Sequence, residues 1–286
     1  MKRVLITGAN SYIGTSFEKY VLEKGIDFEI DTLDLLEPNW KDYDFSGYDS
    51  VFHVAGIAHF SKDESKKELY YKVNTELTEH VAKIAKQAGV GQFIFMSSII
   101  VYGDSTSGER VITKDTQPAP SDFYGDSKLQ AEQRLEKLVG DNFRVVILRP
   151  PMIYGKGSKG NYPKLSKVAQ KTPIFPKISN SRSMLHIFAL CEFVKQVIKL
   201  ELSGVYCPQN SEYVNTSELV KAIAEVHGKK VCLTKIFNPI IKFFFHLDTV
   251  KKVFGNLTYN QSLSQYEFEY QIVDFNESIR LTEGYL

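Results

Sequence analysis

The stretch that decides the fold is Val4-Leu5-Ile6-Thr7-Gly8-Ala9-Asn10-Ser11-Tyr12-Ile13-Gly14. Its first four residues predict a strand buried on both faces, and Thr15 to Lys24, followed by Gly25, predict a helix. A glycine turn between such a strand and a helix offers backbone N–H groups and the positive end of the helix dipole to a pyrophosphate. The turn therefore predicts a dinucleotide site, in which Ser11 is a small residue at the place of the usual middle glycine.

The alternation of strand and helix continues to Pro150-Pro151. We expect strands near Ile30 and over 50–54, 92–96 and 144–148, and helices over 70–88 and 124–139. Apolar strands separated by helices are typical of an α/β fold with a Rossmann-like, doubly wound parallel sheet. We therefore assign residues 1–151 to a domain that binds the dinucleotide.

The pattern changes after Pro151, where helices are expected over 162–170 and 190–200 and short strands over 204–207 and 230–234. This predicts a smaller α+β substrate lobe over residues 152–286, with parts of the chain allowed to cross between the lobes. Phe243-Phe244-Phe245 is the most apolar stretch of this part, and we expect it to pack in the core.

The composition excludes several classes of function. Lys plus Arg number 35 and Asp plus Glu 34, so no charge excess favours nucleic acid as a partner. No segment reaches the ~18 apolar residues of a membrane span, and we expect no membrane partner. Cys191, Cys207 and Cys232 lie far apart, without the spacing of a metal site or a disulfide framework. A reducing, cytoplasmic location fits best.

An acidic side chain near the end of the second strand would bind the adenosine ribose, and Asp31 and Asp34 are both candidates. Residues 27–38 contain no Lys or Arg that would receive a 2′-phosphate. The sequence therefore favours NAD over NADP, although NADP stays possible.

Tyr124 and Lys128 are four residues apart, so they lie on one face of the predicted helix. A nearby ammonium stabilises a phenolate and moves a tyrosine, whose ordinary pKa is ~10, towards useful acid–base range. Ser98 follows the strand over 92–96, at the carboxyl-terminal edge where parallel sheets bind ligands. These three residues predict a hydride-transfer site in which Tyr124 moves a proton and Ser98 holds the reacting oxygen.

With these motifs, the sequence resembles the extended short-chain dehydrogenase/reductase superfamily, in its nucleotide-sugar epimerase, dehydratase and ketoreductase branch, nearly end to end. The other carrying segments are His53-Val54-Ala55-Gly56, Asn74, Met96-Ser97-Ser98, Val101-Tyr102-Gly103 and Arg149-Pro150-Pro151-Met152-Ile153-Tyr154-Gly155.

The resemblance implies roles for individual residues. Ser98, Tyr124 and Lys128 take the catalytic positions, with Ser98 and Tyr124 also touching substrate. Asn161 and Arg182 take substrate positions, the latter at the diphosphate, because a planar guanidinium suits phosphate oxygens. The implied cofactor contacts are Gly8, Asn10, Ser11, Tyr12, Ile13, Gly14, Asp34, Ala55, Asn74, Lys128 and Pro150. Asn74 is expected to be more structural than chemical, neither His53 nor His59 is expected to be catalytic, and no metal is implied.

The resemblance also limits the reaction. Dehydratases of this branch carry an Asp-Glu pair where this chain has Ile99-Ile100, which argues against dehydration. Two reactions at C4 of a UDP-linked sugar remain: reduction of a 4-keto-6-deoxy-hexosamine, and 4-epimerisation with retained NAD. Segments such as Arg149 to Gly155 and Asn180 to Ser183 look most like ketoreductases of bacterial capsule and surface-polysaccharide pathways, which favours reduction, whereas the NAD preference favours epimerisation.

The intact catalytic set argues against a non-catalytic cofactor sensor. The family often pairs subunits through the helices over 70–88 and 124–139, so we expect a homodimer.

Overall fold

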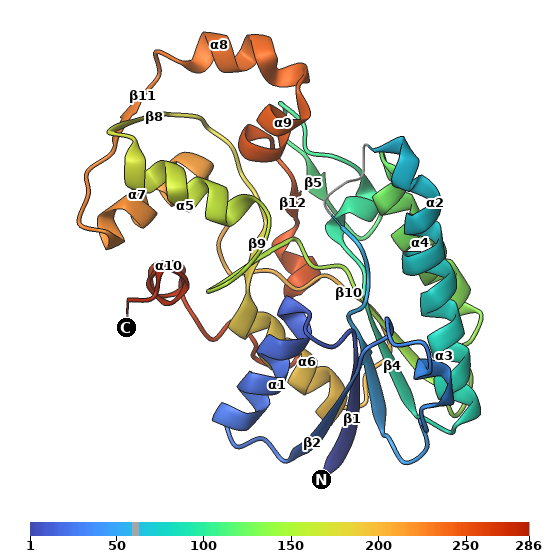
Figure 1. Ribbon diagram of the computed structural model, residues 1–286. Coiled ribbons are helices and arrows are strands. Elements are labelled where there is room, and N and C mark those ends of the chain that lie inside the picture. The colour runs from blue at the N-terminus through green and yellow to red at the C-terminus, as the bar shows by residue number, and fades with distance from the viewer. Residues whose placement is uncertain (59–62, 286) are drawn as a thin grey trace. The chain divides into compact units, whose positions relative to one another are not determined.

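The computed structural model describes residues 1–58 and 63–285 and divides them into two units. Unit 1 contains Met1–Gly103, Gln117–Pro150 and Cys191–Cys207, and unit 2 contains the remaining described residues. Figure 1 shows the elements of both. One of the points at which the chain passes between units lies between Pro150 and Pro151. His59 lies outside the described residues.

Unit 1 is built on a six-stranded sheet in the order β10-β6-β4-β3-β1-β2, and every neighbouring pair is parallel. The strands are β1 (Lys2–Thr7), β2 (Phe28–Leu33), β3 (Ser50–His53), β4 (Gln92–Met96), β6 (Arg144–Leu148) and β10 (Gly204–Tyr206). We expected residues 204–207 in the C-terminal lobe, but β10 pairs with β6. A three-residue strand carries too little pattern to show which sheet it joins.

Helices cover both faces of this sheet, which confirms the doubly wound α/β fold (Figure 1). They are α1 (Tyr12–Glu23), α2 (Lys67–Tyr70), α3 (Thr78–Gln87), α4 (Phe123–Glu136) and α6 (Ile187–Lys199), with the π-helix η3 (Tyr71–Leu77) and the 3₁₀ turns η1 (Trp40–Asp42), η2 (Glu64–Lys66) and η4 (Ile99–Tyr102). Leu5 packs into the core beside α3 and α4, whereas Phe52 of β3 meets Phe17 of α1. Alternate side chains of the buried strands therefore serve the two helical layers.

Unit 2 consists of helices around three short parallel pairs of strands. The pairs are β7 (Met152–Tyr154) with β9 (Met184–His186), β8 (Ile174–Pro176) with β11 (Cys232–Thr234), and β5 (Val111–Ile112) with β12 (Thr258–Tyr259). The helices are α5 (Asn161–Lys171), α7 (Thr216–Val226), α8 (Asn238–Phe243), α9 (Asp248–Phe254) and α10 (Phe275–Glu283), with the 3₁₀ turns η5 (Phe244–His246) and η6 (Gln261–Ser264). Helices α5, α7 and α10 enclose the unit's own apolar core.

The expectation that Phe243, Phe244 and Phe245 pack in a core is wrong. Phe243 is 74% exposed and Phe244 42% exposed, and Phe245 is only partly buried. Helix α8 has just six residues, and none of them is buried. The run crosses from the end of α8 into η5, so successive rings point to different sides, and the surrounding chain covers little of them.

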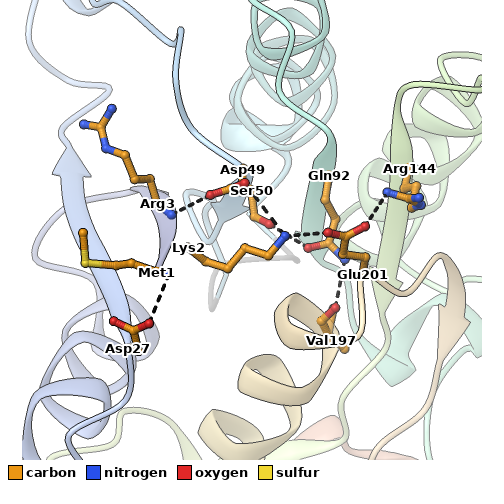
Figure 2. Close-up of polar contacts among 10 residues, drawn as sticks. All are labelled: Met1, Lys2, Arg3, Asp27, Asp49, Ser50, Gln92, Arg144, Val197 and Glu201. Atoms are coloured by element: carbon orange, nitrogen blue, oxygen red, sulfur yellow. Dashed lines mark hydrogen bonds and ion pairs between the residues drawn. The ribbon is translucent and has the colours of Figure 1, made fainter.

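Charged side chains join the amino-terminal ends of the strands in unit 1 (Figure 2). The Glu201 carboxylate pairs with Lys2 Nζ at 2.5 Å and with Arg144 Nη1 at 3.1 Å, and Lys2 Nζ lies 3.8 Å from Asp49. Glu201 adopts a left-handed conformation with φ of 49°. These pairs are partly exposed and contribute at most about 1 kcal/mol each, so their main effect is to fix the turn before β10.

Candidate active site

The glycine turn predicted from the sequence connects β1 to α1. Gly8 has φ of +105°, and a Cβ there would lie 2.7 Å from the backbone nitrogen of Ala55. Gly14 also approaches β1 closely, since a Cβ on it would lie 3.0 Å from Ile6 Cγ2. Both positions therefore require glycine, the first for the turn and the second for packing of the helix on the sheet.

Ser11 is the N-cap of α1, and its Oγ accepts a hydrogen bond of 3.1 Å from the Gly14 N–H. This explains a serine at the position where glycine is usual, because the side chain satisfies a donor of the first helical turn. Asn10 precedes it with φ of 62°, a conformation that asparagine tolerates better than most residues. The first-turn N–H groups of Tyr12 and Ile13 have no acceptor within the helix by its geometry, which leaves them available to an anion.

The two acidic candidates lie in different places. Asp31 is inside β2, where it accepts a hydrogen bond of 2.7 Å from the Tyr48 hydroxyl and lies 3.6 Å from Arg3. Asp34 directly follows the last residue of β2 and accepts a hydrogen bond from the Leu36 N–H. Only Asp34 is at the carboxyl-terminal end of the strand, where the ribose-binding acid of this fold belongs.

Asn74 holds the segment that follows β3. Its side-chain oxygen accepts from the Ile57 N–H at 2.9 Å, and its nitrogen donates to the Ile57 carbonyl at 3.0 Å and to Ser127 Oγ at 3.1 Å. A Cβ on Gly56 would lie 3.0 Å from this side chain and 3.1 Å from Lys128 Nζ. Asn74 thus fixes the backbone after Ala55 beside Lys128, which is the structural role we expected of it.

The catalytic candidates come together at the carboxyl-terminal end of β4. Ser98 is the N-cap of η4, and Tyr124 lies in the first turn of α4. Gly125 allows α4 to approach η4 closely, because a Cβ there would lie 2.8 Å from the Ile100 carbonyl oxygen. The Pro150 carbonyl, at the end of the neighbouring β6, accepts from the Ile99 N–H at 2.9 Å and anchors the same corner.

Burial controls the protonation of the pair on α4. Removal from water raises the pKa of Tyr124 to about 12, and the hydrogen bond with Ser98 acts in the opposite direction. The same effect lowers the pKa of Lys128 to about 8, and the nearby Glu132 opposes it. The Lys128 ammonium donates a 2.8 Å hydrogen bond to the Met96 carbonyl and lies 4.6 Å from the centre of the Phe95 ring. At neutral pH the Tyr124 phenol and the Lys128 amine are therefore both protonated.

A buried ion pair that was not predicted from the sequence supports this corner. The Arg149 guanidinium binds both carboxylate oxygens of Glu132, which also accepts from Ser97 Oγ. Arg149 further donates to the Tyr102 hydroxyl at 2.7 Å. The network connects α4, β6 and both ends of the segment that carries Ser98. The signal was present, because Tyr124, Lys128 and Glu132 are spaced by four residues and share one helix face.

His53 is fully buried in unit 1, and both of its ring nitrogens are engaged. Nδ1 lies 2.7 Å from the Thr7 hydroxyl and Nε2 lies 3.0 Å from the Thr78 hydroxyl. Desolvation lowers the pKa of His53 to about 3, and the positive charge of Lys128 adds to this effect. The ring is therefore neutral and has no nitrogen left for a substrate.

The two substrate candidates belong to unit 2. Asn161 is the first residue of α5, and Arg182 forms backbone bridges to Val214 and Leu257. The Arg182 guanidinium donates to the Gly255 carbonyl at 3.1 Å, and burial lowers its pKa to about 10. No ion pair joins Arg182 to a carboxylate among the residues the structure describes. A desolvated guanidinium without a counter-ion favours an anionic ligand.

A hollow of about 220 Å³ lies at the opposite, amino-terminal edge of the sheet, lined by residues that include Lys2, Arg144 and Glu201. It is an unsuitable site for this chemistry. Its charged groups pair with one another (Figure 2), and ligands of parallel α/β sheets bind at the carboxyl-terminal edge.

Comparison with known proteins decides the family. The sequence profile of the NAD dependent epimerase/dehydratase family matches residues 4–204. The chain belongs to this family. It is accordingly a nicotinamide-dependent enzyme of the extended short-chain dehydrogenase/reductase type, as the motifs predicted.

Family members of known activity are similar over most of the chain. A UDP-glucose 4-epimerase from Vibrio cholerae is 30% identical over 90% of this chain and 86% of its own length. An N-acetyl-α-D-glucosaminyl-diphospho-ditrans,octacis-undecaprenol 4-epimerase from Escherichia coli O157:H7 is 29% identical over 80% of this chain and 73% of its own. The structure of RMD from Pseudomonas aeruginosa, complexed with NADPH, covers 99% of both chains with a TM-score of 0.78 and 18% identity. At this identity the last comparison supports the fold alone.

The glycine turn fits the dinucleotide of this family. The close approach of Gly8 to Ala55 leaves no room for a side chain, so the backbone itself forms the surface of the turn. Among the residues the structure describes, the Tyr12 hydroxyl is buried without a hydrogen-bond partner. The backbone N–H groups of the turn are the groups suited to phosphate.

Gly8→Ala is expected to lower the affinity for NADH by about tenfold or more, because the added methyl group strains the left-handed backbone and collides with Ala55. Titration of the cofactor-free protein measures this. Gly25→Ala is the matched control, since Gly25 has φ of +59° but no atom within 4 Å of the added Cβ. Equal losses in the two variants would show that backbone strain, and not the shape of the turn, limits binding.

Proposed function

We propose that this enzyme is a 4-epimerase of a UDP-linked hexose or N-acetylhexosamine that works with retained NAD. The observation that carries the proposal is the placement of Ser98 just after β4 and of Tyr124 and Lys128 on α4, in a chain whose two relatives described above are both 4-epimerases. The position of Asp34 at the end of β2, without a basic residue over 27–38, supports NAD as the cofactor.

Each residue of the set has a chemical part in the proposed reaction. Tyr124, once it has lost its own proton, accepts the proton of the C4 hydroxyl when the sugar is oxidised and returns it when the sugar is reduced. Ser98 holds the C4 oxygen through a hydrogen bond, and Lys128 stabilises the Tyr124 phenolate and binds the nicotinamide ribose. When bound, NAD supplies the acceptor and the donor of the C4 hydride. Both half-reactions use the same proton site, as a reversible epimerisation requires.

We assign the remaining contacts by the same reasoning. Gly8, Asn10, Ser11, Tyr12, Ile13 and Gly14 form the pyrophosphate turn, Asp34 binds the adenosine ribose, and Ala55, Asn74 and Pro150 shape the nicotinamide side. In unit 2, Arg182 binds the diphosphate of the substrate and Asn161 a neighbouring polar group. The desolvated guanidinium of Arg182 supports its role, because an anion would supply the missing counter-charge.

Reduction of a UDP-4-keto-6-deoxy-hexosamine is the second candidate. It is favoured by the segments that resemble C4 ketoreductases, among them Arg149 to Gly155 and Asn180 to Ser183. Ile99 and Ile100 provide no acid or base for dehydration, so the choice is between these two reactions. They differ in what happens to the cofactor, which an epimerase retains and a reductase releases after each turnover.

The test begins with protein purified without added nucleotide, which is denatured and analysed for NAD⁺ and NADH. A 4-epimerase is expected to release about one cofactor per chain, and to convert UDP-glucose or UDP-N-acetylglucosamine into its C4 epimer without added cofactor. An empty protein that oxidises NADH only with a UDP-4-keto sugar would overturn the epimerase and establish the reductase. Activity with neither class would reject both proposals.

The lowered pKa of Lys128 predicts a pH effect on activity. Because the folded protein loses the Lys128 proton near pH 8, kcat/KM is expected to fall above that pH as the ammonium that supports the Tyr124 phenolate disappears. A pH–rate profile measures the limb. A profile that stays flat to pH 10 would contradict the assigned role.

The lowered pKa of Lys128 also makes the free energy of unfolding depend on pH, in a direction that can be stated. Lys128 binds its proton less tightly in the folded protein than at the usual pKa of 10.5 in the unfolded chain. Between about pH 8 and 10.5 the unfolded chain therefore holds more protons, so the contribution of Lys128 to the free energy of unfolding rises with pH in this window. Urea unfolding of the wild type minus that of Lys128→Met isolates the contribution from other titrating groups.

A further inference from the structure

The side chains that α8 and its flanking residues expose to solvent are mostly large and apolar, which is unusual. Ile236, Ile240 and Phe243 are 78%, 56% and 74% exposed, and Phe237, Phe244 and Leu247 are exposed to between 38% and 45%. We call residues 236–247 the α8 surface. Large apolar side chains exposed singly are ordinary, but six within twelve residues mark a surface that binds something.

The geometry of α8 and η5 places these side chains together. Ile240, Phe243 and Phe244 are spaced i, i+3 and i+4, which puts them on one side of the helix. The rings of Phe243 and Phe244 are in edge-to-face contact, with centroids 5.1 Å apart. Ile241 and Phe245, which are offset from this side, are partly buried. In Figure 1, α8 runs along the top of unit 2, beyond β11 and α9.

Positive charge flanks the apolar side chains. Lys235 precedes the α8 surface, Lys242 lies within it, and Lys251 and Lys252 follow on α9, whereas Asp248 is the single acidic residue between 235 and 254. The whole chain has a net charge of only +1, so this segment is distinctly more basic than the rest. Lys235, Lys242 and Lys252 are exposed.

We propose that the α8 surface docks onto an anionic lipid bilayer. A short helix with a ridge of Phe, Ile and Leu and neighbouring lysines has the composition of segments that lie in the membrane interface, where the rings enter the headgroup region and the ammonium groups pair with lipid phosphates. An apolar contact and a basic contact together supply the two signals that stable attachment needs.

The attachment is to the bilayer surface. No helix over residues 1–58 and 63–285 is long and apolar enough to cross a membrane. The proposal revises the expectation that the protein has no membrane partner, which considered membrane spans alone. It is independent of the proposed function, because it uses none of the residues of the candidate active site.

Vesicle flotation of the full-length protein tests the proposal. Vesicles of phosphatidylcholine alone are compared with vesicles of phosphatidylcholine and phosphatidylglycerol in equal parts, at low and at high salt. The wild type is expected to float with the anionic vesicles, and less at high salt. Ile240→Ser/Phe243→Ser and Lys235→Glu/Lys242→Glu are each expected to weaken binding by about tenfold. Because these side chains are exposed, the thermal unfolding midpoint should not change.

Lys19→Glu/Leu22→Ser is the matched control, since this pair on α1 is equally exposed, with Leu22 at 81%. Retained flotation of this variant, with loss in the two α8 variants, supports the proposal. Failure of the wild type to float, unchanged binding of the α8 variants, or equal loss in the control would overturn it. A different result would identify another occupant of the α8 surface. If the wild type does not float but forms a concentration-dependent dimer in gel filtration, and Ile240→Ser/Phe243→Ser abolishes that dimer, then the α8 surface joins two copies of this chain and the proposal is overturned.

Discussion

Tyr124→Phe is expected to lower kcat by about two to four orders of magnitude while cofactor content stays unchanged. The phenylalanine ring preserves the edge-to-face contact with Tyr70, whose centroid lies 6.0 Å away, so the substitution removes only the hydroxyl. In the proposed reaction this hydroxyl is the group that carries the C4 proton in both directions, so its loss stops the proton transfer. Steady-state kinetics with a UDP-hexose, together with the cofactor released on denaturation, measures both quantities.

Tyr71→Phe is the control for this prediction. Its hydroxyl lies in the same region of unit 1 but donates to Asp126 at 2.7 Å and has no part in the proposed chemistry. Its kcat is expected to stay within about threefold of the wild type, since a single partly exposed hydrogen bond contributes only about 1 kcal/mol. Full turnover by Tyr124→Phe would contradict the mechanism and reopen the possibility of a protein that binds the cofactor without turnover.

Glu132→Ala is expected to lower the free energy of unfolding by about 3–5 kcal/mol. Glu132 and Arg149 are 1% and 8% exposed, so the variant leaves a buried guanidinium without its carboxylate. Urea unfolding measures the loss. Glu79→Ala provides the comparison, because Glu79 pairs with Lys83 and Arg134 near the surface and is expected to cost about 1 kcal/mol or less.

The double variant Glu132→Leu/Arg149→Met separates stability from positioning. Apolar residues of similar size are expected to restore most of the lost stability, because neither charge remains buried alone. The segment between Ser97 and Tyr102 would still lack its hydrogen bonds, so kcat is expected to stay low while KM changes little. If the double variant regained both stability and kcat, Glu132 and Arg149 would be structural residues without effect on Ser98.

The features that depend on local chemistry, the glycine turn and the helix with its Tyr124 and Lys128 spacing, could be predicted from the sequence. A glycine turn between an apolar strand and a helix has one common structural outcome, and Gly8 and Gly14 show why, since a methyl group at either would collide with a neighbouring strand or loop. The spacing of Tyr124 and Lys128 similarly depends on the geometry of a single helix. These features need no knowledge of the rest of the fold.

Features that depend on distant contacts were missed or wrong. Glu132 joins the site through Arg149 on another element, and no local pattern reveals that partner. The three residues of β10 pair with β6 although more than fifty residues separate them along the chain. Phe243 and Phe244 are apolar enough for a core, yet the fold exposes them. Pattern shows which residues prefer burial, but tertiary packing determines which are covered.

The most direct test of 4-epimerisation uses UDP-glucose or UDP-N-acetylglucosamine labelled with deuterium at C4, incubated with the purified enzyme without added cofactor. We expect a C4 epimer that keeps the deuterium at C4, because the hydride that leaves the sugar returns to it from a retained cofactor. No epimer, or transfer of the deuterium to nucleotide released into solution, would contradict 4-epimerisation through retained NAD.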